Sequence, residues 1–415
     1  MFSVLKISGV RLKILPEHKT VDIIRNMQGE YMTEAGNNYS EKKTQLHISV
    51  RNLVEFIFRE GDIDNRSSRA MSADAMMEGT RIHRKIQGSM GKEYQAEVPL
   101  EGDLYELTVE GRADGIFTED GKCFVDEIKG MYRRVELFEK PVFVHRAQAM
   151  CYAYIFALQN NMETIGIQMT YCNLETEQTK YFREEFSFEE IKKWFDDLME
   201  EYGKWATFQC EMKNQRQASI KELDFPYEYR PGQKKLVSDV YRTIMRQKLL
   251  FMQAPTGVGK TISTIFPAVK AVGEELADRI FYLTAKTITA TVAKETFALL
   301  EKNGYRAKTI QITAKEKLCP CDEMECNPVT CPYAKGHFDR VNDAVFDLLH
   351  RCEMIERDDI LSQADRYTVC PFELCLDTAS WCDNVICDYN YVFDPNVYLK
   401  RFFQEGIKGD YIFLI

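Results

Sequence analysis

The stretch Ala254-Pro255-Thr256-Gly257-Val258-Gly259-Lys260-Thr261 decides the fold of the second half of this chain. The apolar run 249–252 before it predicts a buried strand, and the run 262–272 after it predicts a helix. The two glycines allow backbone N–H groups to curl around a phosphate, and the helix start adds its positive dipole end. Lys260 can reach terminal phosphates, and the Thr261 hydroxyl can bind Mg²⁺. The stretch predicts a nucleoside triphosphate site. An alanine stands first where the general pattern has glycine, and a plain glycine-rich turn is the alternative.

The composition is that of an ordinary globular chain with room for two or three domains. Its 415 residues are 45% apolar and 28% charged, with a formal net charge of −10. No run of eighteen apolar residues exists, so we expect no membrane span, and residues 1–13 lack the apolar core of a secretory signal. These features predict a cytoplasmic protein with reduced thiols. The acidic balance does not exclude a nucleic-acid binder, because a channel needs only a local basic lining.

The order of predicted strands and helices indicates an α/β chain in two main parts. Residues 1–46 are polar and mixed, and they form an N-terminal extension of unclear role. Residues 47–210 form a first domain, which opens with a helix capped by Ser49. Residues 211–224 continue a polar stretch and are predicted to be a linker. The second domain then spans residues 225–415.

A hairpin in the first domain brings carboxylates together. Residues 107–129 predict two strands joined at Asp120-Gly121, a strong type I′ turn signal. Counting outward from the turn, Asp114 faces Glu127, and Lys129 lies on the same face as Glu127. Opposed carboxylates repel each other unless a cation lies between them, so the group suits a divalent metal on oxygen ligands. A solvated hairpin with scattered charges is the alternative.

Three residues on predicted helices add to this group. His83 lies on an apolar helix face, where a lone histidine is more often a packed core residue than a ligand. Gln148 and Tyr152 lie one turn apart on one side of a later helix, a spacing that is unremarkable by itself.

Taken together, these residues resemble the PD-(D/E)XK nuclease family in its RecB/Cas4-like branch. The resemblance rests on His83, Gly111-Arg112-Ala113-Asp114-Gly115, Glu127-Ile128-Lys129 and Gln148-Ala149-Met150-Cys151-Tyr152. It implies a nuclease domain over residues 47–210 in which Asp114 and Glu127 bind Mg²⁺ or Mn²⁺. It also implies that His83 assists in catalysis and in binding the metal, that Lys129 is catalytic, and that Gln148 and Tyr152 contact DNA. The four scattered cysteines of this part do not match the iron–sulfur arrangement of some members, so no cluster is expected here.

The cysteines are unevenly distributed along the chain. Thirteen are present, and nine of them fall between Cys319 and Cys387. Clustering in a reducing compartment indicates metal binding rather than disulfides. Iron–sulfur ligation and zinc both use four thiolates, so the residues alone leave the two open.

The order of motifs in the second domain resembles the XPD/DinG family of superfamily 2 DNA helicases. The motifs are Tyr229-Arg230-Pro231-Gly232-Gln233, the glycine loop, Thr284-Ala285-Lys286-Thr287, the cysteine series and Asp388-Tyr389-Asn390-Tyr391. The resemblance implies that Gln233 reads adenine, that Thr256, Gly257, Gly259, Lys260 and Thr261 hold ATP and Mg²⁺, and that Thr284 and Thr287 touch the DNA backbone. It also implies a [4Fe–4S] cluster on Cys319, Cys326, Cys331 and Cys370, in an insert at about residues 315–375. Cys321 can replace Cys319 or Cys326 in this set, because spacing does not decide between them.

The end of the chain shapes the functional expectation. Residues 410–415 predict an apolar strand, which in the resembled family runs into Asp-Glu-Ala-His. Without that motif and the second motor lobe, we expect an inactive helicase fragment beside a complete nuclease domain. The resulting hypothesis is a DNA helicase fused to a metal-dependent nuclease that acts on single-stranded or forked DNA in repair or replication. The alternatives are a nucleic-acid-binding adaptor with an inert nuclease fold and an RNA-directed helicase.

Overall fold

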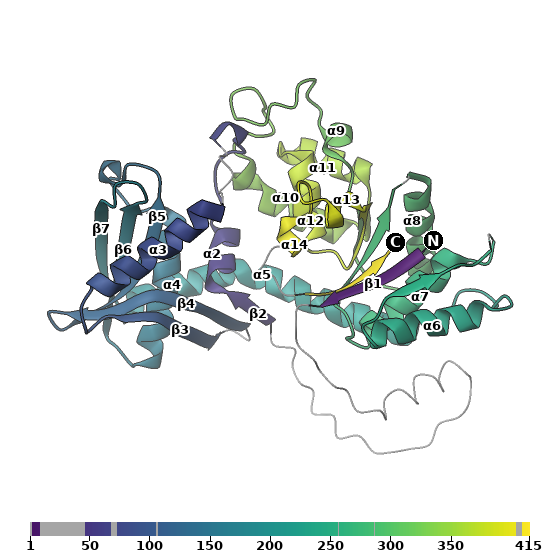
Figure 1. Ribbon diagram of the computed structural model, residues 1–415, viewed down its shortest axis with the longest axis horizontal. Helices are drawn as coiled ribbons and strands as arrows, with labels where there is room; N and C mark the ends of the chain where they lie inside the picture. The colour runs from purple at the N-terminus through teal and green to yellow at the C-terminus, as the bar shows by residue number, and fades with distance from the viewer. Residues whose placement is uncertain are drawn as a thin grey trace, which may run out of the picture.

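The chain is a mixed α/β protein built around two β-sheets, which lie at opposite ends of the long axis (Figure 1). The computed structural model describes residues 2–8, 46–67, 73–104, 107–255, 257–285, 287–403 and 409–415. Within these ranges, no helix combines the length and the apolar character needed to cross a lipid bilayer.

The first sheet has six strands in the order β2-β4-β5-β6-β7, with β3 paired to β4. Its strands are β2 (Leu46–Ser49), β3 (Gln95–Leu104), β4 (Leu107–Glu119), β5 (Lys122–Met131), β6 (Thr164–Asn173) and β7 (Thr179–Ser187). The sheet is mixed, because β2 and β4 run parallel, as do β5 and β6, and the other pairs are antiparallel.

Helices cover this sheet as the apolar periodicity predicts. They are α2 (Val50–Ile57), α3 (Ala73–Ser89) and α4 (Phe143–Gln159), with short 3₁₀ turns at Asn65–Ser67 and Val135–Leu137. Helix α2 begins at the predicted cap, where the Ser49 hydroxyl accepts the Asn52 N–H at 3.1 Å. Ile82 and Ile86 of α3 pack on Ile128 of β5, which holds α3 against the middle of the sheet.

The predicted linker at 211–224 is wrong over most of its length. Helix α5 (Phe188–Lys221) runs without a break through 34 residues and joins the two halves of the molecule (Figure 1). The stretch 204–221 contains neither Gly nor Pro, and Lys, Gln and Ala, which favour helix, make up eight of its eighteen residues. Its polarity therefore marks a partly exposed helix rather than a flexible connection. Arg216 near its end is buried and pairs with Asp383 of the second half.

The second sheet has seven strands in the order β11-β10-β12-β9-β13-β1-β8. They are β1 (Phe2–Ser8), β8 (Leu250–Met252), β9 (Arg279–Thr284), β10 (Thr309–Gln311), β11 (Met354–Ile355), β12 (Asn384–Asp388) and β13 (Asp410–Leu414). The neighbours β11, β10, β12, β9 and β13 are all parallel. This is the arrangement expected where strands alternate with helices.

Strand β1 corrects part of the prediction for residues 1–46. It lies antiparallel between β13 and β8, with Val4 opposite both Leu414 and Leu250. The N-terminal residues therefore include a strand of the second sheet rather than only an extension. The rest of that predicted segment, residues 9–45, lies outside the described residues.

Two groups of helices surround the second sheet. Three belong to the nucleotide-binding pattern: α6 (Gln233–Met245) precedes β8, α7 (Lys260–Gly273) follows β8, and α8 (Thr287–Lys302) follows β9. The others belong to the cysteine-rich part and the segment after it: α9 (Lys315–Leu318), α10 (His337–Arg351), α11 (Arg357–Tyr367), α12 (Pro371–Ala379), α13 (Asn390–Phe393) and α14 (Lys400–Phe403).

An aromatic cluster packs the two halves together. The Trp205 ring of α5 lies 4.9 Å from Phe56 of α2, 4.6 Å from Trp381 and 4.9 Å from Phe346 of α10, measured between ring centroids. Trp205 is among the largest fully buried side chains. Such aromatic pairs add to the stabilisation from buried apolar area, so this contact fixes one half against the other.

Candidate functional site

The hairpin forms at the predicted turn. Asp120 and Gly121 both have positive φ, at 51° and 77°, as a type I′ turn requires. Glu119 pairs with Lys122, and the register continues to Gly115 opposite Asp126. The next step along the same register places Asp114 opposite Glu127, which is the juxtaposition that the sequence predicts.

Glu127 is the most deeply buried carboxylate of this group. Its residue is 1% exposed, and its Oε1 atom lies 2.5 Å from Nζ of Lys129. Burial raises the pKa of Glu127 to about 7, against the opposing charge of Lys129 and with a further increase from Asp114. The other oxygen, Oε2, is buried and finds no hydrogen-bond partner among the described residues. A buried carboxylate oxygen without a protein partner is uncommon and could take a cation as its partner.

Asp114 lies beside Glu127 and is held from three sides. Its Oδ2 accepts the Ile128 N–H at 2.7 Å, and its main-chain carbonyl accepts the Gln87 amide at 2.9 Å. Its Oδ1 lies 3.5 Å from Nδ1 of His83. Burial lowers the pKa of His83, but the hydrogen bond and charge of Asp114 outweigh that effect and hold the pKa above its ordinary value. The structure thus brings together four predicted residues: His83, Asp114, Glu127 and Lys129.

Gln148 and Tyr152 of α4 lie beneath this group. Gln148 is 9% exposed, and its Oε1 lies 3.4 Å from Lys129 Nζ. Tyr152 is 3% exposed, and burial raises its pKa to about 12. A Cβ atom at Gly111 would lie 2.7 Å from the Tyr152 ring, so glycine is required for this close approach. Both side chains therefore lie next to the group, and their contact with DNA stays a prediction.

Sequence reasoning missed a second polar network on the opposite face of β5. Asp126 is fully buried, accepts the Tyr94 hydroxyl at 3.0 Å and accepts the Thr170 hydroxyl at 2.6 Å. Burial raises the pKa of Asp126 to about 6. The available signal was the pair of adjacent carboxylates, Asp126 and Glu127, in the middle of a strand. Successive side chains of a strand point to opposite faces, so the two carboxylates must lie on different faces of the sheet.

The carboxylate oxygens of Asp114 and Glu127 are ligands of the kind that Mg²⁺ prefers. Over the described part of the chain, no three His, Cys, Asp or Glu side chains lie close enough to share one metal ion. Mg²⁺, however, is usually bound by one or two carboxylates, with waters and substrate phosphates completing its shell. Asp114 together with the unpartnered oxygen of Glu127 meets that requirement.

The glycine loop opens onto a cleft at the end of β8. Gly257 and Gly259 have positive φ, at 83° and 79°, and α7 begins at Lys260 as predicted. The Lys260 ammonium donates to the carbonyls of Ala254 and Pro255, each at 3.0 Å. The cleft has a volume of about 920 Å³ and is lined by the loop, by residues 227–233 and by α8. A volume of this size accommodates a nucleotide.

Gln233 braces the loop from the first turn of α6. Its amide donates to the Val258 carbonyl at 3.1 Å and accepts the Arg230 N–H at 3.0 Å. The guanidinium of Arg230 in turn donates to the Gly257 carbonyl. The motif 229–233 therefore meets the glycine loop in space, although the predicted reading of adenine stays a prediction.

Of the three other threonines predicted to bind ligands in this half, the structure describes two, Thr284 and Thr287. Thr284 ends β9, and it lies opposite Asp388 at the end of β12. Thr287 begins α8, and Thr256 lies outside the described residues. Ligands of open α/β sheets bind at the carboxyl ends of the strands, which is the edge where Thr284 and the glycine loop lie.

The four predicted cysteine ligands surround one enclosed cavity. It is lined by Cys319, Cys326, Cys331 and Cys370, together with Ile63, Lys315, Pro320, Tyr333, Ala334, Pro371 and Phe372. Cys321 is not among the lining residues, but its Sγ lies 3.8 Å from Sγ of Cys331. The side chain of Lys315 interacts with Cys326, and Cys370 donates its N–H to Nδ1 of His337 at 3.1 Å. Burial raises the pKa of Cys370 to about 11.

Comparison with known proteins adds little to this geometry. No family model matches the chain, and no match is found among curated proteins. One solved structure with partial likeness is titled "Crystal structure of SSO0001". It covers 44% of this chain and 85% of its own length, at 18% identity and a TM-score of 0.26. A likeness at that level carries no argument about fold or function.

Proposed function

We propose that this chain is a metal-dependent DNA nuclease joined to an ATP-binding helicase motor of the XPD/DinG type. The nuclease has a PD-(D/E)XK fold on the six-stranded sheet, and the motor is a RecA-like lobe on the seven-stranded sheet. The substrate is single-stranded or forked DNA, and the setting is DNA repair or replication.

The observation that carries the nuclease is the state of Glu127. Its buried oxygen without a partner, its raised pKa and its proximity to Asp114 together mark a position that favours a cation. A bound Mg²⁺ or Mn²⁺ there would lower the pKa of a water molecule and offset phosphate charge. Asp114 and Glu127 would hold the ion, and Lys129 would place a positive charge beside the phosphate. His83 orients Asp114 from α3.

The motor half rests on the cleft at the glycine loop. Backbone N–H groups at the start of α7 and the Lys260 ammonium face the same cleft as Gln233 and Arg230. This set of donors suits the phosphates of ATP, and Thr261 lies where it can bind the accompanying Mg²⁺.

We infer an iron–sulfur cluster rather than zinc at the cysteine cavity, because the motifs around it resemble those of the XPD/DinG helicases. Zinc draws four sulfur ligands to about 2.3 Å from one centre. A [4Fe–4S] cluster instead takes one thiolate at each of four iron corners, so its ligands stand around a volume. Cys319, Cys326, Cys331 and Cys370 stand around a cavity, which supports the cluster.

The deciding experiment is cleavage of 5′-labelled single-stranded DNA with Mn²⁺ or Mg²⁺. We expect the wild-type chain to cut and both Asp114→Asn and Glu127→Gln to lose at least about 100-fold in rate. Glu119→Gln is the matched control, because Glu119 is an exposed carboxylate of the same hairpin. Metal-dependent cleavage that survives Asp114→Asn contradicts the nuclease assignment. DNA binding without any cleavage supports the adaptor alternative, and stronger binding of RNA than DNA in competition supports the RNA alternative.

A further inference from the structure

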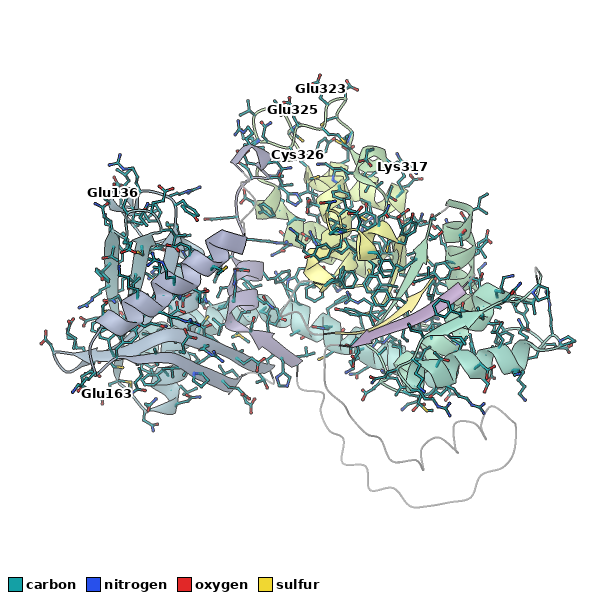
Figure 2. The ribbon with its side chains drawn as sticks, viewed as in Figure 1. Glu136, Glu163, Lys317, Glu323, Glu325 and Cys326 are labelled. Carbon is teal, nitrogen blue, oxygen red and sulfur yellow. The ribbon has the colours of Figure 1, made fainter. Side chains whose placement is uncertain are left out.

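The segment between α2 and α3 lies across the cysteine-rich part of the other half. We name residues 58–67 the strap; in Figure 2 it runs beside the loop that carries Cys326. The Ile63 N–H donates to the Ala334 carbonyl at 2.9 Å, and the Asn65 N–H donates to the Cys326 carbonyl at 2.9 Å. These two bonds pair the strap with the backbone of the loop that holds the cysteines.

Further hydrogen bonds fasten the base of the strap to α10. The Gly61 N–H donates to Oδ1 of Asp339 at 2.7 Å, and the Gly61 carbonyl accepts the Phe338 N–H at 3.0 Å. Oδ1 of Asp62 accepts the Gly336 N–H at 2.6 Å. All three partners lie at the start of α10, and the N–H groups of Gly336 and Phe338 are polar groups that a helix start leaves open.

An ion pair anchors the beginning of the strap. The Arg59 guanidinium lies 2.7 Å from Asp377 of α12 and donates to the Asn342 side chain at 2.7 Å. Both members of the pair are largely buried, with side chains 19% and 14% exposed. Removing one partner of such a pair leaves the charge of the other buried without a counter-charge. The ion pair therefore favours this one position of the strap on the second half.

Ile63 is the point where the strap meets the cavity. It lines the cavity together with the four cysteines, and it comes from the half of the chain that carries the hairpin. We propose that the strap is the outer wall of the cluster pocket, with Ile63 as the side chain that shields the cluster from solvent. This inference rests on the proposed cluster and adds a residue to its site from outside the cysteine-rich part.

The physical argument concerns access. Iron–sulfur clusters are tuned by solvent exposure and by hydrogen bonds around their ligands. Ile63 supplies an apolar cover, and the Asn65 N–H fixes the carbonyl of a ligand residue, Cys326. Along the chain, the next described element after the strap is α3, which carries His83 of the hairpin site.

The test follows the loss of the cluster in air. The full chain, prepared without oxygen and loaded with iron and sulfide, is exposed to air and a chelator, and its absorbance near about 400 nm is followed over time. We expect Ile63→Asp to lose its absorbance at least about tenfold faster than the wild type. Ile63→Leu, which keeps the apolar cover, should match the wild type.

A second variant and a second measurement guard against misfolding. Asp62→Ala removes only the bond to the Gly336 N–H, and we expect it to accelerate cluster loss by a smaller factor. Hydrogen exchange of the Ile63 and Asn65 amides should be slower in the iron-loaded chain than in the iron-free chain. A chain that holds iron but loses it at equal rates in wild type, Ile63→Asp and Asp62→Ala overturns this inference and leaves the cluster standing. A wild-type chain that takes up no iron overturns the cluster, and the inference with it.

Discussion

Lys129 Nζ lies 2.5 Å from Glu127 Oε1, while the second oxygen of the same carboxylate is buried without a partner. One side of Glu127 is thus neutralised by a side chain, and the other is left for a ligand. This division explains how a carboxylate with 1% exposure persists in the sheet.

Replacing Lys129 with Met removes the cation beside Glu127. The largest influence that opposes burial is then gone, and we expect the pKa of Glu127 to rise further above about 7. DNA cleavage should fall at least about 100-fold at neutral pH, since both the ammonium and part of the carboxylate charge are lost. Rates on labelled single-stranded DNA check this, with Lys122→Met at the hairpin turn as the control. An unchanged rate in Lys129→Met rules out a role for the ammonium.

Gly111→Ala should destabilise the first half of the chain. The new methyl group would lie 2.7 Å from the Tyr152 ring, which is buried and has no room to withdraw. We expect a loss of about 1–3 kcal/mol in the free energy of unfolding, measured by urea denaturation. Gly203→Ala is the opposite case, because it lies inside α5 with open space around it. That change should raise stability by about 0.5–1 kcal/mol.

Acid should weaken the fold through His145. Burial lowers the pKa of His145 to about 4, from an ordinary value of 6.5. Between pH 6.5 and 4 the unfolded chain therefore binds a proton that the folded chain does not, so stability falls as the pH drops through this window. The loss is at most about 3 kcal/mol. Unfolding free energies at pH 7.5 and 4.5 should differ less in His145→Asn than in the wild type. An equal difference in both proteins would exclude His145 as the source.

Lys260→Ala should weaken nucleotide binding. Lys260 lines the cleft beside Gly257 and Gly259, and an ammonium–phosphate bond contributes about 1.5–3 kcal/mol. The affinity for a fluorescent ATP analogue should therefore fall about tenfold to 100-fold. Lys234→Ala is the control, because Lys234 adjoins Gln233 but does not line the cleft. Equal affinities of the wild type and Lys260→Ala for the ATP analogue would contradict the proposal that the nucleotide binds in this cleft.

A proline near the end of α5, but still inside it, distinguishes a helix from a linker. Gln215 is an exposed position within the part of α5 that its polarity predicted to be a connection. Gln215→Pro should cost about 3 kcal/mol or more of stability, because proline removes a helical hydrogen bond and clashes with the preceding turn. Gln215→Ala should be nearly neutral. A Pro variant with wild-type thermal stability would show that this stretch behaves as a flexible linker.

Features that depend on neighbouring residues were predictable from the sequence. The Asp120-Gly121 turn sets its own register, so the meeting of Asp114 and Glu127 followed by counting. The glycine loop likewise predicts the strand before it and the helix after it, and both are present as β8 and α7.

Features that depend on distant partners were not predictable in this way. The polarity of 211–224 gave no sign that Arg216 pairs with Asp383, or that α5 joins both halves. Nothing near Ile63 in the chain indicates that it lines a cavity with four cysteines more than 250 residues later. Both contacts arise only when two separately encoded surfaces meet, and local periodicity carries no information about such a meeting.

Strand β1 has a consequence for how the molecule is assembled. Its ladder pairs Val4 with Leu414, so its place in the second sheet forms only after β13, about 400 residues later, has left the ribosome. Folding during synthesis proceeds from the N-terminal side, and contacts of this sequence separation form slowly. Strand β1 is therefore among the last strands of this sheet to dock, and until it does, the edges of β8 and β13 that it covers stay open to other partners.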